Sequence, residues 1–167
     1  VHKVNIIPRG RAMGVTQQLP ERDRYLYPRD YMLDRMTVIM GGRAAEDLAL
    51  NIVTSGAADD LQQATRLARR MVMNWGMSDQ IGHVAWVSES QGYSNDDMGS
   101  GREYSDYTAR ELDQEVRRLV EEAYLRAKDL LHQHREGLDS VVEVLLEKEQ
   151  IYGAELNDIL SQHQPLA

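Results

Sequence analysis

Cysteine and phenylalanine are both absent from this sequence of 167 residues. Without cysteine the chain can form neither a disulfide bond nor a thiolate zinc site, so any metal must be held by His, Asp or Glu. No apolar run approaches the roughly 18 residues that predict a membrane span, and the start shows no signal-peptide pattern. Basic residues are also scarce, because 19 Lys and Arg stand against 27 Asp and Glu, which gives a net charge of −8. This balance argues against nucleic acid as a partner, since phosphate binding draws on clustered Lys and Arg.

What the sequence does contain is typical of a soluble globular domain, with 42% hydrophobic and 28% charged residues. Its length is sufficient for one domain with its own hydrophobic core. Eight methionines supply part of the missing bulk, and we interpret them as fillers of irregular gaps in a helical core. We expect a single domain over residues 1–167. Because the sequence opens on Val1 inside a predicted strand, we also expect that domain to be incomplete at its N-terminus.

The pattern of apolar residues predicts a mainly α fold, a helical bundle-like domain with a small β element at the N-terminus. The β element covers residues 1–20, where two short extended runs flank a Pro/Gly turn, as in a hairpin or a pair of neighbouring strands. Such a two-stranded unit is marginal alone and needs further packing. Helices are predicted over residues 28–160, where apolar residues recur at helical spacing. The polar, glycine-rich stretch 88–105 interrupts them and predicts a mobile loop.

Local signals place the ends of the predicted helices. Pro28 suits a helix start, and the helix that follows either breaks or passes closely against a neighbour at Gly41-Gly42. A second helix starts near Asp59, carries a clean amphipathic stripe and stops at Gly76. The remaining signals are a cap at Ser105 or Asp106 before a long helix, a break near Gly137, and a last helix beginning near Gly153.

The histidines do not form a metal site by their spacing. His132 and His134 lie two residues apart on a predicted helix, where their side chains point away from each other. The other three lie in a predicted strand, a loop and the tail: His2, His83 and His163. None pairs at the i, i+4 spacing with which a helix presents two ligands to one zinc. We therefore interpret them as scattered surface histidines.

Two acidic positions and one strand leave alternatives open. Asp59 and Asp60 open a helix, where acids ordinarily act as a cap and as charges favourable to the helix dipole, but a carboxylate there can equally bind a metal. Glu46 shares a helical face with Gly42, so it either sits in a tight helix contact or is an exposed surface acid. The run Gly14, Val15, Thr16 is either a plain hairpin strand or a sheet edge that accepts a peptide by strand addition.

Several short blocks stand in a characteristic order along the chain. They are Val4-Asn5-Ile6-Ile7-Pro8-Arg9-Gly10, Gly14-Val15-Thr16, Asp23-Arg24-Tyr25-Leu26, Gly41-Gly42-Arg43-Ala44-Ala45-Glu46, Thr54-Ser55-Gly56-Ala57, Leu67-Ala68-Arg69-Arg70-Met71-Val72, Trp75-Gly76-Met77-Ser78 and Tyr152-Gly153. Together they resemble the peptidase domain of the FtsH family, ATP-dependent zinc metalloproteases anchored in membranes. The resemblance runs from Val1 to about Leu160. One departure is His83, where relatives usually have Pro.

That resemblance implies a zinc site of which this chain holds one part. In the family, two histidines of a His-Glu-x-x-His helix and one aspartate hold the metal, and the glutamate of the motif activates water as general base. The motif lies shortly before the segment that matches Val1, so no catalytic residue is expected in this chain. The block Ser-Gly-Ala-x-x-Asp-Leu puts the third ligand on Asp60 and leaves Asp59 as a cap. Glu46 is assigned a supporting or packing role behind the metal ligands, and the strand Gly14–Thr16 resembles the edge that binds substrate.

The resemblance also implies an activity and partners. We expect part of an ATP-dependent zinc metalloendopeptidase that degrades unfolded and membrane proteins, with Zn²⁺ as cofactor and ATP on an AAA-type ATPase module of the same polypeptide. The expected assembly is a homo-hexamer at the cytoplasmic face of the bacterial inner membrane, with its anchor outside this chain; an organellar membrane is the alternative location. Because two ligands and the base are missing, the chain alone is expected to be inactive. The alternative is a catalytically inactive FtsH-like assembly module of a hexameric ring, which the sequence upstream of Val1 would distinguish.

Overall fold

The computed structural model describes residues 1–8, 14–17, 26–52, 54–86 and 104–163. The chain divides into two compact units, which are taken separately below. The first, here called the sheet unit, comprises Val1–Leu26 and Asp129–Ala167, and the second, the helical unit, comprises Tyr27–Lys128. Of the predicted loop 88–105, only Tyr104 and Ser105 fall within the described residues.

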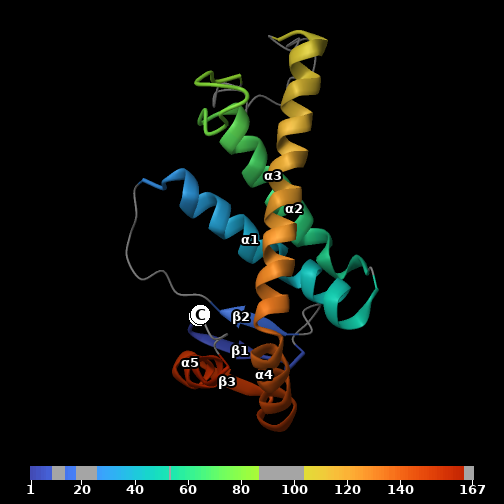
Figure 1. Ribbon diagram of the computed structural model, residues 1–167, viewed down its shortest axis with the longest axis vertical. Helices are drawn as coiled ribbons and strands as arrows, with labels where there is room; N and C mark the ends of the chain where they lie inside the picture. The colour runs from blue at the N-terminus through green and yellow to red at the C-terminus, as the bar shows by residue number, and fades with distance from the viewer. Residues whose placement is uncertain (9–13, 18–25, 53, 87–103, 164–167) are drawn as a thin grey trace. The chain divides into compact units, whose positions relative to one another are not determined.

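The sheet unit contains a three-stranded antiparallel sheet in the order β2-β1-β3 (Figure 1). Its strands are β1 (Lys3–Asn5), β2 (Val15–Gln17) and β3 (Gln150–Tyr152). Val4 lies at the centre, opposite Thr16 of β2 on one side and Ile151 of β3 on the other. The predicted β element at the N-terminus is thus confirmed. The structure adds β3, which arrives from the far end of the chain and completes the sheet.

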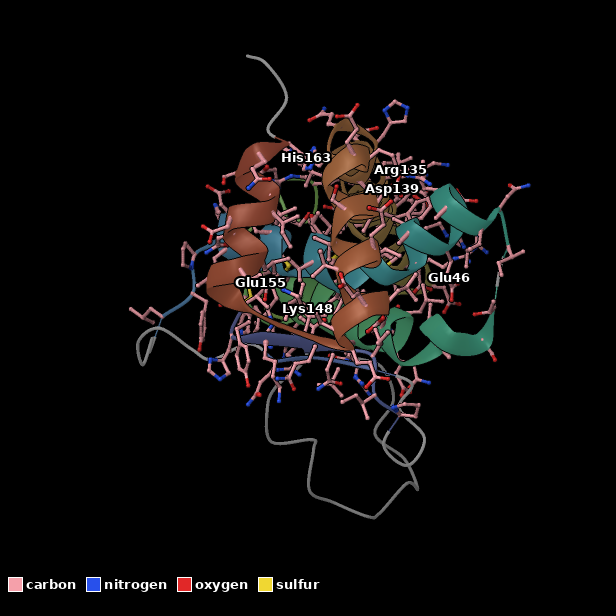
Figure 2. The ribbon with its side chains drawn as sticks, turned by 90° about the horizontal axis from the view of Figure 1, so that it is seen from below. Glu46, Arg135, Asp139, Lys148, Glu155 and His163 are labelled. Carbon is pink, nitrogen blue, oxygen red and sulfur yellow. The ribbon has the colours of Figure 1, made fainter. Side chains whose placement is uncertain are left out.

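The close approach of the chain's first residues to Gly153 requires a glycine at that position. A Cβ atom there would stand 2.2 Å from the carbonyl oxygen of Val1, and the Gly153 amide donates to the carbonyl of His2 at 2.9 Å. Gly153 opens α5 (Gly153–Gln162), as the sequence predicts. The preceding helix α4 (Arg135–Lys148) is linked to α5 by an ion pair between Lys148 and Glu155 at 2.5 Å (Figure 2).

One predicted helix boundary is wrong by a few residues. The break expected near Gly137 falls at His134, and Gly137 lies buried inside α4. A Cβ atom on Gly137 would meet the side chain of Leu160 at 3.2 Å, so this glycine serves the packing of α4 against α5 and does not break a helix. His163, which follows α5, is partly exposed, and its Nε2 lies 3.1 Å from the hydroxyl of Ser140 on α4.

The helical unit is built from three long helices: α1 (Arg29–Ala45), α2 (Ala58–Met73) and α3 (Asp106–Gln133), whose last residues belong to the sheet unit. A short π-helix, η1 (Glu46–Leu50), continues α1, and one 3₁₀ turn, η2 (Ser55–Ala57), leads into α2. The buried apolar residues of this unit include Met32, Met36 and Met40 of α1 and Ala64, Ala68 and Met71 of α2. The expected use of methionine as core filler is therefore confirmed for these positions.

The ends of these helices follow the local signals. Pro28 precedes α1 directly, and the hydroxyl of Ser105 accepts the Thr108 amide at 3.2 Å at the start of α3. α2 ends at Met73, and Gly76 then adopts the left-handed conformation, φ +58°, that favours glycine. At Gly41-Gly42, however, α1 continues without a break. No helix within the described residues is long and apolar enough to cross a membrane.

Candidate metal centre

Asp60 lies in the first turn of α2 and rests against the backbone of α1. Its Oδ2 atom is 3.3 Å from the position that a Cβ atom on Gly42 would take. Because Gly42 has no side chain, the Asp60 carboxylate can pack closely against α1 at this position. Of the two interpretations of the double glycine, the close approach is thus the correct one, and the neighbour that approaches is Asp60.

No described residue compensates the charge of Asp60. Within the described residues its half-buried carboxylate makes no hydrogen bond and no ion pair. Burial raises the pKa of Asp60, and the negative charge of neighbouring Asp59 raises it further. The interpretation of Asp59 as a cap is wrong, because the N-cap position belongs to Ala57 and no side chain caps it; Asp59 is exposed in the first turn, where its charge favours the helix dipole.

Glu46, in contrast, has both carboxylate oxygens engaged. Oε1 accepts a hydrogen bond from the Thr54 hydroxyl at 2.6 Å, and Oε2 accepts one from the Arg43 guanidinium at 3.3 Å. The hydrogen bond from Thr54 is the largest cause that lowers the pKa of Glu46. Glu46 lies at the end of α1, where Figure 2 labels it, and is neither fully exposed nor buried. Its contacts reach the segment that leads into α2.

Asp47 is a further acidic residue at this helix end, and sequence reasoning missed it. Its Oδ2 accepts hydrogen bonds from the Lys128 ammonium at 2.6 Å and from the Tyr124 hydroxyl at 2.8 Å, both on α3. These contacts lower the pKa of Asp47, the one from Lys128 most. Local sequence could not reveal them, because the partners lie 77 and 81 residues further along the chain. Three neighbouring acids thus differ: two bind cationic or hydroxyl donors, and Asp60 does not.

The predicted substrate strand lies in the sheet unit. β2 is an edge strand, and Val15, Thr16 and Gln17 are all exposed. Gly14 precedes it, and a Cβ atom there would stand 2.7 Å from the carbonyl oxygen of Asn5, so glycine allows the chain to run close to β1. On the side of β2 away from β1, no strand of the described part of the chain is paired with it.

A complete metal site would need more than Asp60. In the described part of the chain, no group of three or more His, Asp and Glu side chains could hold a metal ion. An uncompensated, half-buried carboxylate on a fixed helix turn nevertheless fits the part of one cation ligand, because it lacks a positive partner. Within the described residues, Asp60 is therefore a candidate for a single cation ligand.

Comparison with known proteins decides the family. The model of peptidase family M41 matches residues 1–159. The chain belongs to peptidase family M41. The predicted resemblance to FtsH is confirmed, since the M41 match covers nearly the whole chain and the relatives below carry that name.

Three M41 relatives illustrate the similarity. The ATP-dependent zinc metalloprotease FtsH 2 of Salinibacter ruber is 52% identical over 163 residues, which is 96% of this chain and 24% of that protein. The ATP-dependent zinc metalloprotease FtsH of Acidimicrobium ferrooxidans is 51% identical over 162 residues, 97% of this chain and 24% of that protein. The one of Thermotoga maritima is 46% identical over 164 residues, 97% of this chain and 27% of that protein. The chain thus spans about a quarter of the length of the curated relatives it matches.

Proposed function

We propose that this chain supplies one zinc ligand, Asp60, and one substrate-binding strand, β2, to an ATP-dependent zinc metalloendopeptidase. The observation that carries the proposal is the uncompensated Asp60 carboxylate held against Gly42. A bound cation would provide the positive charge that no described residue gives to Asp60. Glu46 and Asp47 are weaker candidates, because Arg43, Thr54, Tyr124 and Lys128 already engage their oxygens.

Asp60 would act as one member of a ligand set whose other members lie outside this chain. Two histidines of a His-Glu-x-x-His helix would complete the site, and the glutamate of that motif would be the general base. When bound, zinc supplies Lewis-acid polarisation of the scissile carbonyl. This chain's own contribution is to hold a carboxylate on a rigid helix turn, so that the ligand is in place before the metal binds. Glu46 supports that turn without ligating the metal.

The substrate would bind along β2 by adding a strand to the sheet edge. Gly14, Val15 and Thr16 are exposed, and the outer side of β2 has no strand partner in the part of the chain that the structure describes. Pairing of this kind recognises the peptide main chain, which every substrate has. It therefore suits an endopeptidase that acts on unfolded and membrane proteins of varied sequence.

We propose that this chain acts as part of a longer polypeptide. The relatives are about four times as long and are named as ATP-dependent zinc metalloproteases. We propose that an AAA-type ATPase module of the same polypeptide feeds substrate to the peptidase domain, in a homo-hexamer at the cytoplasmic face of the bacterial inner membrane with its anchor outside this chain.

The test compares two neighbouring aspartates in the longer polypeptide that carries this chain. Asp60→Asn should abolish stoichiometric zinc binding, measured by metal analysis of the purified protein, and ATP-dependent casein degradation. Asp59→Asn, which changes the same charge one residue away, should retain both. Retention of zinc and proteolysis by Asp60→Asn would overturn the proposal. If the wild-type polypeptide itself binds no zinc and degrades no casein, the chain is instead an inactive assembly module.

The isolated chain provides a second test. With one ligand and no general base, the 167-residue chain should neither hydrolyse casein nor bind zinc tightly. Chelator-sensitive casein hydrolysis by this chain alone would contradict the incomplete site.

A further inference from the structure

The segment that leads into α2 is held by the side chain of Thr54. The Thr54 hydroxyl donates to Oε1 of Glu46 at 2.6 Å and accepts the amide of Gly56 at 3.0 Å. One hydroxyl thus acts as donor and acceptor at once, and links the end of α1 to the start of η2. Arg43 adds to this link, since its guanidinium lies 3.3 Å from Glu46 and 3.4 Å from the carbonyl oxygen of Ile52.

The partner of Thr54 is itself fixed in place. Glu46 opens the π-helix η1, a rare geometry that occurs mostly as single turns and frequently at functional sites. The next residue, Asp47, is bonded to Tyr124 and Lys128 of α3. The two neighbouring acids therefore connect the same turn to two segments: Glu46 to the segment before α2, and Asp47 to α3.

Gly56 allows this segment to lie close to the anchored turn. A Cβ atom on Gly56 would meet the Thr54 hydroxyl at 3.1 Å and Oε1 of Glu46 at 3.3 Å. Gly56 belongs to η2, and α2 follows directly at Ala58. Because a helical turn is stiff, fixing Thr54 and Gly56 also fixes Asp60, four residues after Gly56.

Gly42 limits the position of Asp60 on the side that faces α1. The distance from the Asp60 Oδ2 atom to the position that a Cβ atom on Gly42 would take is only 3.3 Å. Metal ligation tolerates displacements of roughly 0.2 Å from the preferred distances. A shift of a few tenths of an ångström in Asp60 is therefore enough to weaken a metal that it holds.

We propose that Thr54 and Gly42 are positioning residues for the Asp60 ligand, Thr54 by tying the start of α2 to Glu46 and Gly42 by leaving room for the carboxylate. The inference rests on the proposed role of Asp60 as a zinc ligand. Neither residue touches the metal. Both act on zinc affinity by fixing where the ligand lies before zinc arrives.

The first experiment measures zinc affinity by chelator competition in the longer polypeptide that carries this chain. Thr54→Val keeps the branched shape and removes the hydroxyl. Because Thr54 bonds Glu46 and not Asp60 itself, it should lower the affinity by up to about 10-fold, the low end of the loss seen when a direct hydrogen-bond partner of a metal ligand is removed. Thr54→Ser retains the hydroxyl and should restore the affinity. The matched control is Thr65→Val on α2, because among the described residues the Thr65 hydroxyl bonds the carbonyl of Leu61 in its own helix, at 2.8 Å, and no other group. It should leave the affinity unchanged.

The second experiment compares the two adjacent glycines of α1. Gly41→Ala and Gly42→Ala add the same methyl group to the same helix, with the same gain in helix propensity. The methyl group at position 41 meets nothing within 4 Å, whereas the one at position 42 presses on Asp60. Gly42→Ala should lower zinc affinity, and Gly41→Ala should not. This pair tests the inference even if Thr54→Val fails to fold.

The outcomes separate this inference from the proposed function. If Asp60→Asn keeps its zinc, the ligand assignment fails and the inference fails with it. If Asp60→Asn loses zinc but Thr54→Val and Gly42→Ala bind it like the wild type, Asp60 remains the ligand and the positioning role is wrong. Equal losses in Thr65→Val and Gly41→Ala would also overturn it, because the effect would then be general destabilisation.

Discussion

Replacing Glu115 tests how the helical unit keeps a charge in its interior. Glu115 on α3 is 1% exposed, yet both of its carboxylate oxygens are paired. Oε1 accepts hydrogen bonds from the Ser78 hydroxyl at 2.6 Å and from the Arg118 guanidinium at 2.7 Å, and Oε2 accepts a second one from Arg118 at 2.7 Å. Arg118 also binds Glu122. Arg118 thus pairs with one buried carboxylate, Glu115, and one exposed carboxylate, Glu122.

The expected loss of unfolding free energy follows from the interactions that Glu115→Gln removes. The substitution keeps the size and one acceptor, but it loses the negative charge and one of the two bonds from Arg118. Breaking a buried ion pair by removing one partner costs about 3–5 kcal/mol. Because the Arg118 side chain is 33% exposed and retains Glu122, we expect a cost shifted below that range, about 2–4 kcal/mol. Glu122→Gln is the matched control: the Glu122 side chain is 55% exposed, so its loss should cost under about 1 kcal/mol.

The assay is urea unfolding of the 167-residue chain followed by tryptophan fluorescence. The chain has two tryptophans, Trp75 and Trp86, and both lie in the helical unit, so the signal reports on that unit. Each variant gives a free energy of unfolding from the same probe. Equal costs for Glu115→Gln and Glu122→Gln would refute the reasoning, since burial would then make no difference to the value of the pair.

The pH dependence of the same measurement tests the role of the charge. Hydrogen bonds from Arg118 are the largest cause that lowers the pKa of Glu115 below its ordinary value of 4.5, although burial opposes them. A lowered pKa in the folded state means that the stabilisation is fully present above the unfolded-state pKa and is lost as the pH falls through the folded-state pKa. The difference in unfolding free energy between wild type and Glu115→Gln should therefore shrink as the pH falls below the ordinary glutamate range. A difference that stays constant there would show that packing, not charge, sets the cost.

Four further substitutions have expected outcomes. Gly153→Ala brings a methyl group to 2.2 Å from the carbonyl oxygen of Val1; it should destabilise the sheet by about 2–4 kcal/mol, and unchanged hydrogen exchange of the β1 amides would contradict this. Gly41→Ala should raise the unfolding free energy of the helical unit by up to about 1 kcal/mol, because Ala is the better helix former, and a loss by tryptophan fluorescence would count against the open surroundings of this glycine. Met36→Ala removes a side chain that is 0% exposed and should cost about 2–5 kcal/mol. Val38→Ala, at 62% exposure on the same helix, should stay within about 0.5 kcal/mol; similar costs for both would refute the assignment of the core.

The sequence alone was sufficient for the features that depend on neighbours along the chain. The 3.6-residue recurrence of apolar side chains predicted α2, and Pro28, Ser105 and Gly153 marked helix starts that the structure confirms. The two N-terminal strands were also predicted, because two short extended runs around a Pro/Gly turn are a local signal. The ordered blocks identified the family, and with it the expectation that Asp60 is a ligand.

Only the tertiary structure decided which residues meet across long stretches of chain. β3 is three residues long, too short for a pattern of its own, and it forms only because β1 offers an edge some 150 residues earlier in the sequence. Glu115 on α3 looks like any charged helix residue until its burial beside Ser78 is known. The link from Thr54 to Glu46 and the place of Asp60 over Gly42 likewise depend on how the end of α1 packs against the start of α2. Periodicity reports which face of a helix is apolar, but the partner that covers it, and the exact position of a carboxylate, are set by packing between segments that carry no signal of each other.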